Sequence, residues 1–222
     1  MGSRRDRLSR MKWALGLLLL GLAMPAAAAD CPTGRFRAAA GPDVASGLEI
    51  GKDGHFRYFL SMGAVDEGAE GVWTCDKGTL KLTTQPTPKP AAFRLDKVTD
   101  GEEAPFSLVV TWPNGQGVPA VDFRIDFASG EPVTGYTQQD GWARDFEDRW
   151  PTGVQFAEPF YGTESALLPI PQRRGIRLHI VLEPNDMGKA AFDDTLVTQE
   201  DGKLILHWRG GKLPYARDED GE

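Results

Sequence analysis

Glycine-containing turns divide this chain into short runs of alternating apolar and polar residues. Asp53-Gly54 and Asp201-Gly202 each stand between two such runs, and Asp-Gly in that position is a strong signal for a tight β-hairpin. No helical period is visible after residue 29, and the 26 Gly and 16 Pro exceed what a helical protein tolerates. The pattern predicts an all-β chain of antiparallel strands, folded as a sandwich or a barrel.

Two breaks in composition predict how the chain is divided. Residues 85–90 are rich in proline and indicate a rigid connection, and residues 99–104 are polar and acidic. We place the domain boundary at the second break. This predicts an antiparallel β-sandwich C-terminal domain over 105–217, preceded by a smaller antiparallel β-meander over 30–98. One continuous sandwich is the alternative. Residues 218–222 are predicted to be an acidic disordered tail.

The first 29 residues have the organisation of a secretory signal peptide. Five basic residues within 1–12 precede an apolar run of 11 residues over 14–24, and alanines fill 26–29 before Asp30. The apolar run is too short to cross a hydrocarbon layer of about 30 Å. We therefore predict cleavage after Ala29 on the bacterial general secretory route. The mature chain is then periplasmic or secreted, with no membrane span after signal removal.

Charge and cysteine content narrow the classes of partner. The whole chain has a formal net charge of −7, and removal of 1–29 leaves 20 Lys+Arg against 31 Asp+Glu, a net −11. That charge opposes binding to nucleic acid or to an anionic membrane surface. Cys31 and Cys75 are the two cysteines, and a pair in an exported protein predicts one disulfide. We expect no metal site and no cofactor.

Residues 115–142 resemble the carboxypeptidase-regulatory and transthyretin-like β-sandwich modules. The likeness consists of Gly117-Val118-Pro119, the alternating strand over 121–127, and the hairpin residues Tyr136-Thr137 and Asp140-Gly141-Trp142. It implies a binding or spacer module rather than an enzyme. The chain lacks the C-terminal Tyr-Arg-Gly-Ser of the transthyretin-like hydrolases. The N-terminal part is similar to half of a lipocalin-like meander, although about 70 residues are too few for eight strands.

Aromatic residues beside loops are the candidate ligand-binding residues. Trp142, Trp150 and Tyr161 flank predicted loops, and exposed rings in an exported β-sandwich stack on sugars or fill protein interfaces. We predict a non-enzymatic binding or structural module of the cell envelope, whose partner is a protein or a glycan. The alternative is that these three rings pack in the core and bind no ligand.

Two other functional classes stay open at this stage. A small polysaccharide hydrolase would use two of the acids Asp145, Glu147 and Asp148, because glycoside hydrolysis needs a pair of carboxylates across a groove. A purely structural subunit would present a large apolar patch or an open sheet edge. His179 and His207 alternate with apolar neighbours, but no spacing supplies a third metal ligand.

Overall fold

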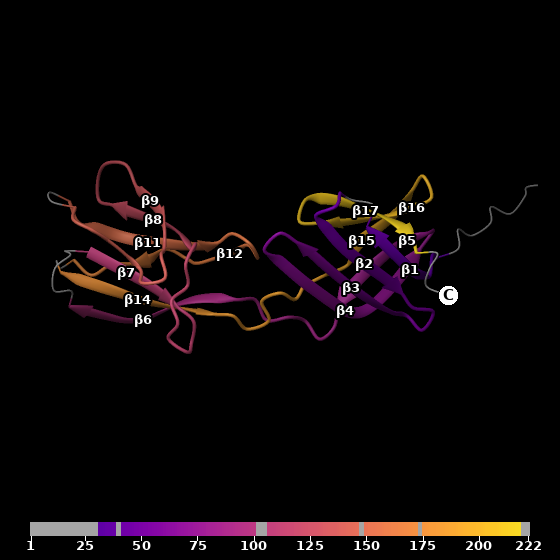
Figure 1. Ribbon diagram of the computed structural model, residues 1–222, viewed down its shortest axis with the longest axis horizontal. Coiled ribbons are helices and arrows are strands. Elements are labelled where there is room, and N and C mark those ends of the chain that lie inside the picture. The colour runs from indigo at the N-terminus through magenta and orange to yellow at the C-terminus, as the bar shows by residue number, and fades with distance from the viewer. Residues whose placement is uncertain (1–30, 39–40, 101–105, 147–148, 173–174, 219–222) are drawn as a thin grey trace, which may run out of the picture.

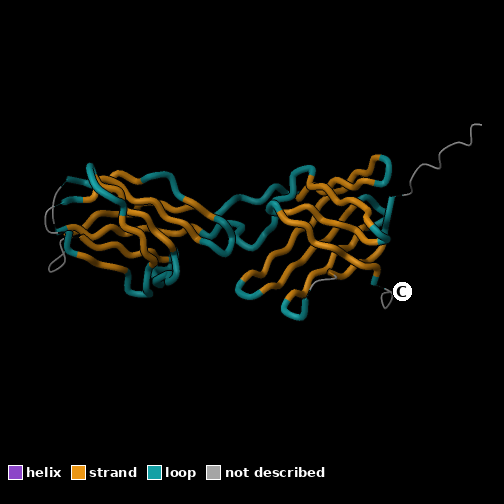
Figure 2. Tube along the Cα trace, turned by 90° about the horizontal axis from the view of Figure 1, so that it is seen from above, coloured by secondary structure: helices purple, strands orange, loops and turns teal. Residues whose placement is uncertain are grey.

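The computed structural model of this chain describes residues 31–38, 41–100, 106–146, 149–172 and 175–218 as two lobes placed end to end (Figure 1). Strands and loops account for all of these residues, as the tube in Figure 2 shows. The all-β prediction is therefore confirmed. Within the same residues no helix is long and apolar enough to cross a membrane. The predicted signal peptide lies outside the described residues.

One lobe is a closed eight-stranded antiparallel barrel. Each strand pairs with the one before it in the lobe, and the last strand pairs with the first, Phe36 opposite Arg217. The strands are β1 (Gly34–Ala38), β2 (Val44–Ile50), β3 (His55–Met62), β4 (Val65–Asp76), β5 (Thr79–Thr84), β15 (Thr195–Glu200), β16 (Lys203–Trp208) and β17 (Gly211–Arg217). Closure leaves this sheet without an open edge.

The other lobe is a sandwich of two sheets. One sheet has the order β10-β7-β14-β6, and the other has the order β12-β11-β8-β9 with β13 beside β11. All pairs are antiparallel except β7 with β14. The strands are β6 (Ala92–Asp100), β7 (Phe106–Thr111), β8 (Asp122–Phe127), β9 (Val133–Tyr136), β10 (Trp142–Arg144), β11 (Pro151–Glu158), β12 (Thr163–Glu164), β13 (Leu168–Pro169) and β14 (Ile176–Glu183).

The division between the lobes differs from the one predicted from composition. The sandwich is an insertion between β5 and β15, and the barrel is built from both ends of the chain. The polar segment taken as the boundary lies at the β6–β7 connection inside the sandwich, so β6 belongs to the sandwich. β15, β16 and β17, assigned by prediction to the C-terminal sandwich, complete the barrel. The N-terminal meander therefore supplies five of the eight barrel strands.

The connection that returns from the sandwich fills the interior of the barrel. Phe192 is buried, and its ring centroid lies 5.0 Å from that of Tyr58 and 4.8 Å from that of Trp208. The backbone N–H of Phe192 donates to Thr84 Oγ1 (3.0 Å), and the N–H of Thr84 donates to the carbonyl of Phe192 (2.9 Å). The inside of this barrel is thus a packed core and not a ligand cavity.

The two cores follow from the alternation in the sequence. Most inward positions of the barrel strands are apolar, as at Leu48 and Ile50 on β2, while Glu49 between them points outward. The sandwich core takes Val121, Phe123 and Ile125 from the run that alternates with charged residues. Each lobe buries its own cluster of apolar side chains, so each has a separate core.

The predicted disulfide between Cys31 and Cys75 is confirmed. It joins the residues before β1 to the end of β4, with 6.1 Å between the Cα atoms and 44 residues of sequence separation. A crosslink over this distance restricts the unfolded chain more than the folded one.

Replacement of both cysteines by serine is expected to destabilise the barrel by on the order of 4 kcal/mol, because the unfolded chain then regains its loop-closure entropy. Hydrogen exchange measured strand by strand in urea would check this. Protection should fall in β1–β5 and β15–β17 and stay unchanged in β7, β8 and β14. Equal loss in both lobes would contradict the separation of the two cores.

Two buried tyrosines make the barrel sensitive to alkaline pH. Burial raises the pKa of Tyr215 from 10.0 to about 12, and its hydroxyl lies 2.7 Å from Ser46 Oγ. Burial, followed by the neighbouring carboxylate of Glu67, also raises the pKa of Tyr58. The fold favours the protonated hydroxyls, so their contribution is complete below pH 10. It is lost as pH rises toward the folded-state pKa.

Urea unfolding between pH 9 and pH 12 should show this loss as a free energy of unfolding that falls by roughly 1.4 kcal/mol per pH unit for each buried tyrosine. Tyr215→Phe should be less stable at pH 8, because the bond to Ser46 is gone, and should show a shallower fall above pH 10. Tyr136→Phe is the matched control, because Tyr136 is exposed. An identical slope in all three proteins would contradict the assignment.

Candidate binding site

The two predicted ligand-binding tryptophans pack against the core of the sandwich. The Trp142 ring meets the Phe123 ring edge-on, with 4.8 Å between centroids. Trp150 donates from Nε1 to the carbonyl of Pro171 (2.9 Å) and lies edge-on to Phe106. Both tryptophans are half-buried, so packing in the sandwich accounts for much of their surface. Their role in binding a ligand stays a prediction.

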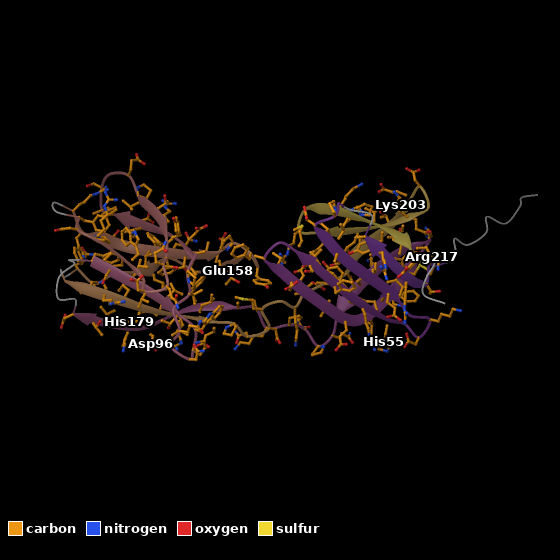
Figure 3. The ribbon with its side chains drawn as sticks, viewed as in Figure 1. His55, Asp96, Glu158, His179, Lys203 and Arg217 are labelled. Atoms are coloured by element: carbon orange, nitrogen blue, oxygen red, sulfur yellow. A yellow bond between two sulfur atoms is a disulfide. The ribbon has the colours of Figure 1, made fainter. Side chains whose placement is uncertain are left out.

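Tyr161 lies at the end of the sandwich that faces the barrel. Glu158 is buried there, and its carboxylate accepts the backbone N–H groups of Phe160 (3.2 Å) and Tyr161 (2.8 Å). Figure 3 labels Glu158 beside the junction of the lobes. The Tyr161 hydroxyl donates to the carbonyl of Asp66 on β4 (3.4 Å). This half-buried ring therefore contributes to the junction, and it is not brought together with Trp142 or Trp150.

The acids proposed for a hydrolase cannot be placed as a pair. Asp145 is exposed and follows β10, while Glu147 and Asp148 lie outside the described residues. The two histidines considered for a metal lie in different lobes, His179 on β14 (Figure 3) and His207 on β16. Among the described residues, no group of three or more His, Cys, Asp or Glu is arranged to hold a metal ion.

Each of these histidines has a local hydrogen-bond partner. His179 Nε2 lies 3.0 Å from Thr99 Oγ1, and His207 Nε2 lies 2.9 Å from Thr198 Oγ1. Burial, assisted by the nearby cations of Lys97 and Arg177, lowers the pKa of His179. These contacts bind each imidazole to the neighbouring strand of its own sheet.

An open hollow of about 520 Å³ lies on the outer face of the β12-β11-β8-β9 sheet. We call it the sandwich groove. Strand register places four outward side chains in one row across the sheet: Tyr136 on β9, Asp122 on β8, Ala157 on β11 and Glu164 on β12. The row covers three strand spacings, which is about 14 Å for paired strands. A second row beside it holds Thr134, Arg124 and Gln155.

Small side chains on β11 determine where this face is hollow. Ala157 is the shortest side chain in the first row and lies between the carboxylates of Asp122 and Glu164. Gly153 occupies the same face of β11 two positions before Gln155, but the side chain of Leu167 covers it. The open floor is therefore confined to the part of the sheet around Ala157.

The polar groups of the sandwich groove are largely free of internal partners. Within the described part of the chain, no hydrogen bond or ion pair engages the side chains of Asp122, Tyr136 or Glu164. Arg124 bonds through Nε to Asp126 Oδ1 (2.9 Å), and its two terminal nitrogens have no hydrogen-bond partner among the described residues. Gln155 donates its amide to the carbonyl of Ser165 (3.1 Å), so its side-chain oxygen is left as an acceptor.

Tyr136 supplies an aromatic surface at one end of the sandwich groove. It is 59% exposed, the most exposed of the large hydrophobic side chains in the described residues. Trp142 and Trp150, by contrast, are half-buried and pack against the sandwich core. A ring held on a strand, next to the carboxylate of Asp122 and near Arg124, provides a stacking surface and hydrogen-bonding groups in one place.

A larger hollow, of about 830 Å³, lies on the outer face of β1, β2 and β3 in the barrel. Its exposed ring, Phe59, lies directly over Gly47, where a Cβ atom would collide with it. Its cations are partly neutralised, since Arg37 donates from Nε to Asp218 Oδ2 (2.8 Å). Packing on a glycine and internal ion pairing account for these residues within the fold. We therefore favour the sandwich groove as the candidate binding site.

Comparison with protein-family models, with curated proteins and with solved structures finds no match to this chain.

The residues of the sandwich groove are not among the predicted site residues, although the sequence contains a signal for them. Asp122 and Arg124 are the polar members of the clearest alternating strand, and Tyr136 stands on the solvent side of β9. An aromatic residue in the polar phase of an antiparallel strand faces water. The aromatic residues predicted to bind a ligand were instead those next to loops, and two of them, Trp142 and Trp150, pack on the core.

Replacement of Trp142 by alanine should reduce the stability of the sandwich by about 3–5 kcal/mol, because it removes a ring packed on the core. Thermal unfolding followed by calorimetry would measure this loss. The matched variant Tyr136→Ala removes a ring that is mostly in solvent and should shift the transition far less. If Trp142→Ala leaves the transition in place, the ring is not part of the core and its predicted ligand role gains support.

Proposed function

We propose that this chain is an exported, non-enzymatic binding protein of the bacterial cell envelope, and that it binds a glycan through the sandwich groove. The observation that carries the proposal is the row in which the exposed Tyr136 ring stands beside Asp122, with Glu164 at the other end, and in which both carboxylates are unpaired within the described residues. A sugar ring presents a C–H face and a rim of hydroxyls. Those two features match an aromatic ring and fixed hydrogen-bonding groups.

The length of the groove favours a polymer over a single sugar. Polar side chains extend from Tyr136 to Glu164 across four strands, and Thr134, Arg124 and Gln155 offer further groups along the second row. A ligand that contacts both ends must span about 14 Å. An oligosaccharide laid across the strands meets that requirement.

Export is supported by the predicted signal peptide and by the disulfide. Structural disulfides are a feature of oxidising compartments such as the periplasm. The periplasm and the cell surface are also where envelope glycans are available as ligands.

Binding is favoured over hydrolysis by the surroundings of the carboxylates. A glycosidase needs one carboxyl group placed so that it can act as an acid, commonly by burial against an apolar wall. Asp122 and Glu164 are both exposed. The sandwich groove therefore has groups that orient a sugar and lacks a sheltered acid.

A glycan array probed with the mature chain, residues 30–222, would test the proposal. The wild-type protein should bind at least one class of envelope glycan. Tyr136→Ala should weaken that binding by about tenfold, the loss expected for one stacking ring, while Tyr136→Phe retains it. The matched control is Phe59→Ala, which removes an exposed ring from the barrel and should leave binding unchanged.

The outcomes separate the candidate functions. Binding that responds equally to Tyr136→Ala and Phe59→Ala would move the site away from the sandwich groove. No binding to any glycan would overturn the glycan proposal and favour a protein partner. Release of shorter sugars from a bound oligosaccharide would show that the chain is an enzyme.

A further inference from the structure

The charges around the sandwich groove indicate which glycans it would accept. We propose that the ligand is a glycan with free, protonated amino groups, such as a polymer that contains de-N-acetylated amino sugars. This inference rests on the proposed function, because it assigns the chemical class of the ligand at the same groove. It identifies the group on the ligand that would pair with Asp122 and Glu164. These two carboxylates flank the floor of the groove at Ala157.

The local balance of charge is the first step. Asp122, Glu164 and Asp126 contribute three negative charges on this face, against one positive charge from Arg124. Arg124 is 2.9 Å from Asp126, so its charge is offset within the strand. The two carboxylates beside Ala157 are left without a cation in the described part of the chain. A neutral glycan would leave both charges uncompensated, whereas an ammonium group on the sugar would pair with them.

The spacing of the carboxylates is the second step. Asp122 and Glu164 lie on β8 and β12, with β11 and its Ala157 between them. Two strand spacings separate them, about 9.5 Å in an ordinary sheet. One amino group centred over Ala157, or two amino groups on successive sugars, would approach both carboxylates. The short side chain at 157 leaves the space that this approach requires.

The ring of Tyr136 is the third observation in favour of an amino sugar. An aromatic face attracts a cation as well as a C–H surface. The ring stands next to Asp122 in the row, on the side away from Ala157. A sugar stacked on Tyr136 would therefore bring a substituent toward Asp122. A large N-acetyl group at that position would be uncharged and would lose the ion pair, so the free amine should bind more tightly.

Binding of matched oligosaccharides would test the inference. The probes are glucosamine and N-acetylglucosamine oligomers of the same length, titrated calorimetrically into the mature chain at constant salt. The glucosamine oligomer should bind about tenfold more tightly, and the preference should shrink as salt is raised, because salt screens exposed charges. Asp122→Asn combined with Glu164→Gln should remove most of the preference while retaining the acetylated ligand.

Asp201→Asn is the matched control, since it removes one negative charge from an exposed turn of the barrel and keeps the positive φ that Asn tolerates. It should leave the preference unchanged.

Equal affinity for the two oligomers, with Tyr136→Ala still weakening both, would overturn the amine inference and leave the glycan proposal standing. Failure of both oligomers and of every other glycan would overturn the proposed function itself. A preference that Asp201→Asn reduces as much as the double variant would assign it to net charge and overturn the inference.

Discussion

The antiparallel pairing of β6 with β14 is the constraint on which the two-lobe arrangement depends. These strands are the first and last of the sandwich, and they pair from Asp100 opposite Ile176 to Ala92 opposite Glu183. Because the two ends of the insertion leave the sandwich side by side, β5 and β15 can still pair as neighbours, Leu82 opposite Thr195. The barrel closes as though the insertion were one long loop. Without that pairing, 110 residues of intervening chain (85–194) would have to be held at the barrel wall by the connections alone.

The connections themselves are tied to each other and to β4. Asp186 bonds to Lys89 twice, from its backbone N–H to the carbonyl (3.0 Å) and from the Lys89 N–H to its carboxylate (2.9 Å). Gly68 on β4 bonds to Gly188 and Ala190 of the returning connection, and Phe192 then enters the barrel core. One consequence is functional. The interior position that a ligand takes in a hollow barrel is occupied by the protein's own phenylalanine, which leaves the outer surfaces as the places to look for a binding site.

The local pattern of the sequence predicted the strands well. It could not predict which strands are neighbours, because that depends on pairing between residues far apart in the chain. The alternation at 121–127, the Asp53-Gly54 and Asp201-Gly202 turns and the cysteine pair all concern residues close in sequence or few in number, and each appears in the structure as expected. The order of the strands within a sheet, in contrast, has no local signal in the sequence. The acidic break near residue 100 looks like a linker, yet it connects two strands of one sheet. Nothing local marks β17 as the partner of β1, because that pair is fixed by closure of the whole barrel. The same holds for the two rings Tyr136 and Trp142. Whether each ring is packed or exposed depends on the neighbouring strands, so local pattern alone could not predict it.

Polar side chains that have no partner among the described residues distinguish the sandwich groove from the larger hollow on the barrel. A protein surface ordinarily places opposite charges across adjacent strands, as Arg35 and Glu49 do at 3.9 Å. Such pairs lower the gain from any ligand, because a new partner must first displace the old one. Ala157 lies between Asp122 and Glu164, and the one cation of this face, Arg124, is paired with Asp126, so in the described part of the chain no cation pairs with either carboxylate. The short side chain of Ala157 thus has two effects. It leaves the floor of the sandwich groove open, and it carries no positive charge, whereas a lysine or arginine at 157 would neutralise the carboxylates. Introducing Ala157→Arg should therefore close the groove sterically and electrostatically at once, while the core face of β11 is unaffected.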